Sequence, residues 1–257
     1  MNIFVAGKDK THPLAVAFNM LLLSVGIILL FWFILARVGY VFDFSFLPEI
    51  SGRLWYGFLM TVCLSAASLM LSLALGVVTA VMQSGKVLVL RYISKLYVTV
   101  IRGTPLIVQI YLFYYIIGTA FGIENRFLCG VLILSVFEGA YIAEIVRGSL
   151  LSMDGTQLEA AKAVGFTKKQ TIRFVILPQL TARTLPALTG QFASIIKDSS
   201  LLSIIAVIEL TQTVREITAW NFKIFECFLV LGAMYLVLTL PISFFTRRLE
   251  RSFYYEN

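Results

Sequence analysis

Long apolar runs without charge are the feature that most limits how this chain can fold. Four of these runs contain no charged residue, and they lie at 15–36, 54–82, 103–123 and 227–246. A helix needs about 20 apolar residues to cross a bilayer, so each run predicts one transmembrane helix. A fifth run at 127–146 predicts another, although it contains Glu138 and Glu144.

A sixth span is predicted between Arg183 and Glu209. Its first uncharged segment, 184–196, is too short to cross a bilayer alone, and the polar sequence KDSS follows at 197–200. More uncharged residues come after it, so we predict a fifth span in chain order that is broken in its outer half. Backbone of this kind is tolerated inside a membrane only where it is buried in protein or lines water.

Composition and charge support an all-α membrane protein of six spans. Hydrophobic residues make up 59% of the chain and charged residues only 14%, against about 25% charged residues in a soluble domain. The net charge of +7 does not indicate nucleic acid, because most Lys and Arg lie in alternate loops. Since short basic loops stay in the cytoplasm, both termini are predicted to be cytoplasmic in a multi-pass plasma-membrane protein.

The predicted organisation has three parts. Residues 1–50 form a cytoplasmic tail and the first helix, residues 51–250 form the core domain, and residues 251–257 form a second tail. Cys63, Cys129, Cys227 and the single His12 show no metal-ligand spacing, so no metal site or bound cofactor is expected. Free thiols are predicted, with a bridge between Cys129 and Cys227 as the alternative.

The second span carries small residues on one helical face. Ser65, Ser68, Ser72, Gly76 and Ala80 follow one another at steps of three or four. Such a stripe lets two helix backbones approach closely in lipid. We predict that it packs against another span, and we assign it no chemistry.

The loop at 147–183 is too long for a simple connector. The pattern at 157–164 favours a helix, which Gly165 can end in a left-handed conformation. Thr167 is a suitable cap for a second short helix. The first helix is rich in alanine and therefore slim enough to enter a groove on another protein. An amphipathic loop lying on lipid headgroups is the alternative.

The sequence EAAKAVGFTKKQTIRFVILP at 159–178 has a characteristic spacing. It resembles the coupling-loop signature of the permease subunits of bacterial ABC importers. The matching positions are Glu159, Ala160, Ala161, Gly165, Val175, Leu177 and Pro178, where Val175 replaces the usual isoleucine. The segment before the loop helix, 153–156, departs from the Ile-Pro-Lys-Gly that is frequent in the family.

Three further stretches resemble the polar amino acid branch of that family. They are RGTPLIVQIYLFYY at 102–115, GAYIAEIVRGSL at 139–150 and KDSSLLSII at 197–205. The resemblance extends over about 53–250 and leaves the first 50 residues without a signature. It implies a transport subunit for polar or charged amino acids rather than an enzyme.

The resemblance also implies partners. ATP and Mg would bind two separate ATPase subunits, which agrees with the lack of a GxxxxGK[ST] motif in this chain. A second permease chain, identical or related, would complete the path, and an extracytoplasmic solute-binding protein would deliver the amino acid. The segment 209–226 is polar enough to contact that protein, and a helix lying on headgroups explains it equally well.

Ionisable and polar residues within the spans are the candidates for the substrate path, since such groups are costly in lipid and usually face a cavity or a partner. The candidates are Glu138, Tyr141, Gln109, Gln191, Lys197, Asp198 and Ser199. Lys197 and Asp198 suit the carboxylate and ammonium of a zwitterion, with mutual neutralisation as the structural alternative. For Glu144 we predict a structural ion pair with Arg147 or Arg102.

Two other classes of function fit parts of the sequence. A stand-alone secondary transporter would use Glu138 for proton coupling and would need no ATPase, but it leaves the spacing at 159–178 unexplained. A membrane-embedded enzyme would need paired catalytic groups or metal ligands at one depth, which the sequence does not offer.

Overall fold

The computed structural model describes residues 13–254, and the chain forms two compact units, Met1–Ser45 and Phe46–Asn257. His12 and both extreme ends lie outside the described residues. All regular elements within the described range are helices. The first unit contains α1 (Pro13–Val38), which is apolar on every face and has no buried stretch. A helix of that kind is suited to lipid on all sides.

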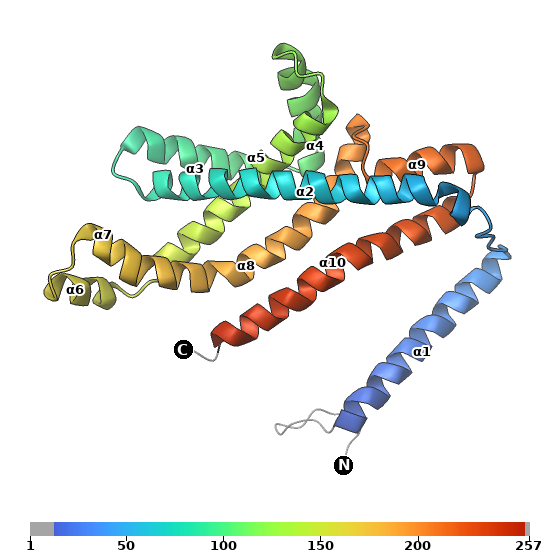
Figure 1. Ribbon diagram of the computed structural model, residues 1–257, viewed down its shortest axis with the longest axis horizontal. Coiled ribbons are helices and arrows are strands. Elements are labelled where there is room, and N and C mark those ends of the chain that lie inside the picture. The colour runs from blue at the N-terminus through green and yellow to red at the C-terminus, as the bar shows by residue number, and fades with distance from the viewer. Residues whose placement is uncertain (1–12, 255–257) are drawn as a thin grey trace. The chain divides into compact units, whose positions relative to one another are not determined.

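Three long apolar helices in the second unit match predicted spans (Figure 1). They are α2 (Leu47–Ser84), α5 (Arg126–Leu151) and α10 (Ile224–Tyr254). With α1 they give four helices that are long and apolar enough to cross a membrane. The prediction of an all-helical membrane protein is therefore confirmed, while the count of six spans stays a prediction.

The predicted third span, 103–123, is wrong as a single helix. The helices α3 (Leu88–Gly103) and α4 (Leu106–Leu112) meet at an angle of 111°, and α4 continues into the π-helical η1 (Phe113–Gly118). Together α4 and η1 are too short to cross a bilayer. The apolar stretch becomes long enough only when α3 is included, as one bent span.

Pro105 explains the bend between α3 and α4. A proline disfavours helical backbone in the residue before it, and Thr104 is indeed extended, with φ −123° and ψ 145°. Thr104 does not cap α4; its hydroxyl donates back to Val100 O at 2.9 Å. The Gln109 amide donates to Ile101 O at 2.7 Å and to Thr104 O at 3.1 Å, which fixes the bend.

The predicted break at 197–200 takes the form of a change of helix type rather than a loss of helix. The α-helix α8 (Leu177–Asp198) ends there and passes directly into the 3₁₀ helix η3 (Ser199–Ile205). The serines are tolerated because their hydroxyls bond back along the helix: Ser199 Oγ donates to Ile196 O at 2.8 Å and Ser200 Oγ to Lys197 O at 2.6 Å. The chain turns only at Ala206, where φ is +54°. The short helix α9 (Leu210–Asn221) follows.

Helices α2 and α5 pack most closely in the second unit, and the small-residue stripe of α2 lies buried between them. Gly76 shows why: a Cβ there would lie 2.5 Å from Ile142 Cγ2 and 3.0 Å from Gly139 O. The predicted role of the stripe in packing is confirmed. All three cysteines are free, so no bridge joins Cys129 to Cys227.

We expect Gly76→Ala to destabilise the second unit. The added methyl group overpacks the contact with Ile142, which costs about 1–3 kcal/mol. Gly52→Ala is the matched control, since it also lies in α2 but has nothing within 4 Å of its Cβ. Because alanine favours a helix over glycine by about 1 kcal/mol, the control is expected to leave the melting temperature unchanged or raise it. Equal melting temperatures in detergent would contradict the packing argument.

Candidate functional site

The loop between α5 and α8 contains two short helices joined at Gly165. Helix α6 (Gly155–Ala163) begins at Asp154, whose carboxylate accepts from Thr156 N at 3.0 Å. This hydrogen bond holds the pKa of Asp154 below its usual value. Gly165 has φ +80°, and Phe166 N donates to Ala161 O at 3.0 Å while Gly165 N donates to Lys162 O at 3.0 Å. This pair of bonds is a Schellman motif, which terminates α6.

Thr167 starts the second short helix, α7 (Lys168–Thr171), as the sequence predicts. Its hydroxyl accepts from Gln170 N at 3.4 Å, and the Gln170 side chain accepts from Thr167 N at 2.8 Å, so the two residues form a capping box. The π-helical η2 (Ile172–Ile176) then leads into α8. The Schellman motif that ends α6 and the capping box that starts α7 therefore hold the two helices in a fixed orientation. We call this turn around Gly165 the elbow.

Two side-chain contacts brace this loop against the neighbouring long helices. Gln179 at the start of α8 donates to the Gln157 side chain of α6. Arg183 in α8 donates to Ser152 O and, at 2.8 Å, to Ser152 Oγ, just beyond the end of α5. These contacts join α6 to the start of α8, and the end of α5 to α8.

Most of the loop residues singled out in the sequence are exposed. Glu159, Ala160, Gly165, Leu177 and Pro178 are exposed, and Ala161 is buried. Large apolar side chains beside them also face outward, with exposed fractions of 72% for Val164 and 60% for Phe174. Exposed apolar patches rimmed by polar residues mark surfaces that contact another protein or a membrane.

The structure brings Glu138 of α5 and Gln191 of α8 together. Glu138 is fully buried, one carboxylate oxygen accepts a hydrogen bond from the Gln191 amide, and Oε1 has no partner within the described residues. The carboxyl of Asp198 lies close enough to interact with Glu138. Two acidic groups and one amide therefore gather between α5 and α8.

The other predicted path residues lie elsewhere or have other contacts. Gln109 fixes the bend between α3 and α4. Tyr141 packs against Phe137, with ring centroids 5.0 Å apart, and lies below the guanidinium of Arg102. Lys197 is exposed, Ser199 is buried, and no ion pair joins Lys197 to Asp198 in the part of the chain that the structure describes.

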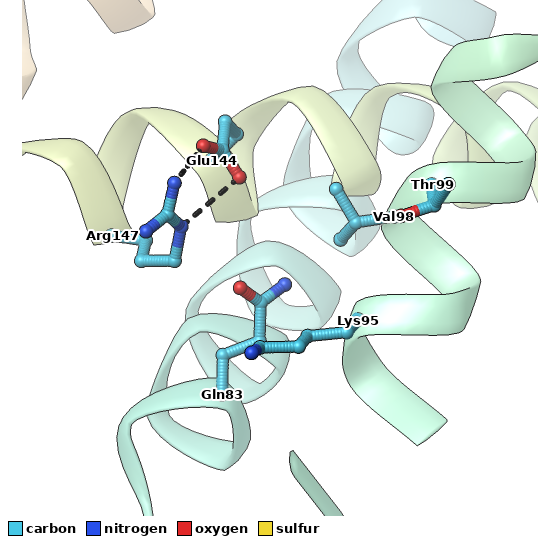
Figure 2. Close-up of a pocket in the computed structure, with 6 residues that line it drawn as sticks. All are labelled: Gln83, Lys95, Val98, Thr99, Glu144 and Arg147. Atoms are coloured by element: carbon cyan, nitrogen blue, oxygen red, sulfur yellow. Dashed lines mark hydrogen bonds and ion pairs between the residues drawn. The ribbon is translucent and has the colours of Figure 1, made fainter. Parts of the chain in front are cut away.

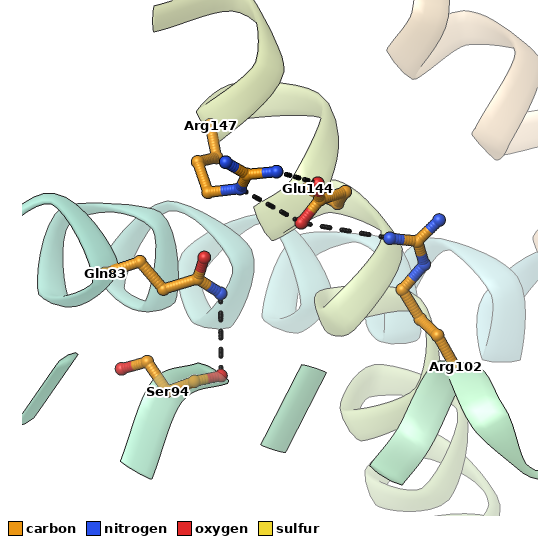
Figure 3. Close-up of polar contacts among 5 residues, drawn as sticks. All are labelled: Gln83, Ser94, Arg102, Glu144 and Arg147. Carbon is orange, nitrogen blue, oxygen red and sulfur yellow. Dashed lines mark hydrogen bonds and ion pairs between the residues drawn. The ribbon is translucent and has the colours of Figure 1, made fainter. Parts of the chain in front are cut away.

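Glu144 pairs with both arginines that the sequence offered (Figure 3). Arg147 donates two hydrogen bonds to its carboxylate, one of them at 3.1 Å, and Arg102 Nη1 lies 3.8 Å from Oε2. The Arg102 guanidinium also lies 5.2 Å from the centroid of the Tyr141 ring. The cluster joins α3 to α5 next to the bend.

Sequence reasoning missed two features. One is the pocket between α2, α3 and α5, which includes Lys95 and Gln83 (Figure 2). The other is Glu209, which is fully buried and caps α9 by accepting from Thr211 N at 2.8 Å and Gln212 N at 2.7 Å. Glutamate is not among the residues preferred at an N-cap, so nothing in the sequence indicated this role.

Comparisons with known proteins agree with one another. The family described as "Binding-protein-dependent transport system inner membrane component" matches residues 72–254. The glutamine transport system permease protein GlnP of Escherichia coli (strain K12) is 37% identical over 82% of this chain and 97% of that protein. The L-cystine transport system permease protein TcyB of Bacillus subtilis (strain 168) is 36% identical over 80% and 87%.

Two solved structures share the fold. A chain of an amino acid ABC transporter with histidines has a TM-score of 0.76 and 31% identity, over 83% of this chain and 100% of that chain. A chain of the inward-facing MetNI methionine ABC transporter has a TM-score of 0.65 over 82% and 99%. At 19% identity the second likeness supports the fold alone.

Proposed function

Because this chain belongs to the family of inner membrane components of binding-protein-dependent transport systems, we propose that it is the permease subunit of an ATP-driven importer of polar or charged amino acids. The observation that carries the proposal is the rigid elbow at Gly165, whose residues match the coupling signature and expose apolar side chains. The related chains named for glutamine and L-cystine support an amino acid as substrate.

The loop at 147–183 is the segment through which the ATPase subunits pass their movement to the permease. Two ATPase subunits, which carry ATP and Mg, close and open, and the surface at Glu159, Ala160 and Gly165 rests in a groove of one of them. Because the elbow is capped on both sides, it moves as a rigid body. The contacts Gln179–Gln157 and Arg183–Ser152 pass that movement to α8 and α5.

The path for the amino acid runs beside Glu138 and Asp198, where α5 and α8 meet. These helices enter and leave the coupling loop, so its movement changes their separation. The Glu138–Gln191 hydrogen bond spans that separation. The acidic groups suit the ammonium group of an amino acid, and a second permease chain, identical or related, closes the path on its other side.

The orientation follows from the same proposal. Six spans, with α3 and α4 together as one and α8 with η3 as another, place both termini and the coupling loop in the cytoplasm. Helix α9 then lies at the outer face, where Arg53 and Glu216 form an ion pair at 2.8 Å. Trp220 and Phe222 are exposed there and offer a surface to the solute-binding protein.

The test is reconstitution of the chain with and without its ATPase. With the ATPase and the solute-binding protein present, we expect ATP hydrolysis to rise when one polar amino acid from a panel is added, and that amino acid to accumulate. The chain alone is expected to accumulate none, with or without a pH gradient.

The same assay separates the rival function. A proton-coupled secondary transporter would accumulate substrate without any ATPase and would respond to an imposed pH gradient. Uptake of that kind, abolished by an uncoupler, would overturn the proposal.

A further inference from the structure

A pocket of about 320 Å³ lies between α2, α3 and α5, apart from the Glu138 site. Its lining residues are Gln83, Lys95, Val98, Thr99, Glu144 and Arg147. Figure 2 shows Lys95 reaching toward Gln83, with Glu144 and Arg147 on the facing helix. Ligand pockets typically measure about 300–1,000 Å³, so this one fits a small polar group rather than a whole large ligand.

The pocket carries an excess of positive charge. Glu144 is its one acid, and Arg147 and Arg102 both pair with it (Figure 3). Lys95 belongs to none of the ion pairs that the structure shows among its described residues. The ammonium group of Lys95 is therefore free to bind an anion, and Thr99 adds a hydroxyl that can donate to it.

The outer surface of α3 indicates which kind of anion the pocket would bind. Arg91, Lys95 and Arg102 follow one stripe of the helix, and the neighbouring face is apolar and exposed. That face carries Val89, Tyr92, Ile93, Leu96 and Val100, with exposed fractions between 50% and 65%. A helix with a basic stripe beside an apolar face matches a molecule that has a negative head and a hydrocarbon tail.

We propose that this pocket binds the phosphate of an anionic lipid from the cytoplasmic leaflet, with Lys95 and Arg147 as the residues that contact it. The acyl chains lie along the apolar face of α3. The placement in the cytoplasmic leaflet rests on the proposed function, which puts the coupling loop at that side. Basic pockets between transmembrane helices on the cytoplasmic side are known to suit such headgroups.

The consequence is mechanical. A bound phosphate holds the end of α5 that leads into the coupling loop against α3, through Arg147 on one side and Lys95 on the other. Lipid composition then adjusts how readily α5 moves when the ATPase closes.

The test measures retained lipid and needs no transport. The complex with its ATPase is purified from membranes that contain phosphatidylglycerol and phosphatidylcholine, and bound lipids are counted by native mass spectrometry. Lys95→Ala is expected to lower the retained phosphatidylglycerol about fivefold, the equivalent of about 1 kcal/mol, whereas Lys95→Arg retains it. Lys86→Ala is the matched control, because Lys86 is exposed near the same end of α2 but does not line the pocket.

Every outcome decides the proposal. Equal losses for Lys95→Ala and Lys86→Ala would show general charge attraction and overturn it, as would equal retention of both lipids by the unchanged chain. Inorganic phosphate provides the second arm: if it removes phosphatidylglycerol at millimolar concentration, the site binds free anions and the lipid assignment is wrong. Since Lys95 is exposed, its variants are expected to fold. The count of retained lipids does not depend on uptake. A failed uptake assay would therefore contradict the proposed function without contradicting the lipid site.

Discussion

Gly165→Val is expected to lower amino acid uptake by the reconstituted transporter about tenfold or more while the complex still assembles. Gly165 adopts φ +80°, and a left-handed conformation costs a residue with a side chain about 1–2 kcal/mol, most of all when it is β-branched. The space around its Cβ is open, so the cost comes from the backbone and not from a clash. The elbow must then change its angle, and α6 no longer meets the ATPase in the same orientation.

Two controls isolate the backbone conformation. Gly165→Asn should keep most of the uptake, because asparagine tolerates the left-handed region. Gly155 lies in the same loop, has open space where a Cβ would be, and has no positive φ. Gly155→Ala should therefore transport normally. The measurement is uptake together with the ratio of amino acid transported to ATP hydrolysed. Normal uptake by the valine variant would remove Gly165 from the coupling mechanism.

The elbow was predictable from the sequence because its rules are local. A glycine after a run of helix formers and a threonine three residues before a glutamine each act on backbone groups within one turn. Neither motif needs a contact from a distant part of the chain in order to form. The same holds for the long apolar spans, where the bilayer fixes the length of the helix.

The bend between α3 and α4 was not predicted, although Pro105 carried a local signal for it. Hydropathy counts apolar residues, and the basic stripe at Arg91, Lys95 and Arg102 kept most of 88–103 out of the predicted spans. In the folded chain that stripe lies along one edge of a helix that packs against α2 and α5 through Ser94, Val98 and Ile101. Long basic side chains tolerate such positions because their stems pack while their charged ends reach polar surroundings.

The contact between Glu138 and Gln191 also depends on tertiary structure. Glu138 and Gln191 were each recognised as polar residues in apolar spans, but the sequence could not show that they meet. Gln109 carried the same signal and instead fixes a bend, because the proline after Thr104 leaves carbonyl groups of α3 without helical donors. A polar residue within a span thus indicates a required partner, and the fold decides which.

We expect Glu138→Gln to lower uptake about tenfold or more without disrupting the complex. The substitution keeps the shape of the side chain and replaces a carboxylate, which attracts an ammonium group, with a neutral amide. A tenfold change corresponds to about 1.4 kcal/mol, which is within reach of one hydrogen bond to a charged group, worth about 1.5–3 kcal/mol. Uptake kinetics across a panel of amino acids, with assembly checked by co-purification of the ATPase, provide the measurement.

The exchanged pair Glu138→Gln with Gln191→Glu separates a path residue from a structural one. It restores a carboxylate–amide hydrogen bond between α5 and α8 but moves the negative charge from one helix to the other. If the charge must face the amino acid from α5, uptake stays low although the packing is restored. If the exchange returns uptake to normal, the pair serves only to join the helices, and the path must be sought at Asp198 or beyond it. Stability and transport respond differently here because a hydrogen bond is indifferent to which partner bears the charge, whereas a bound ammonium group is not.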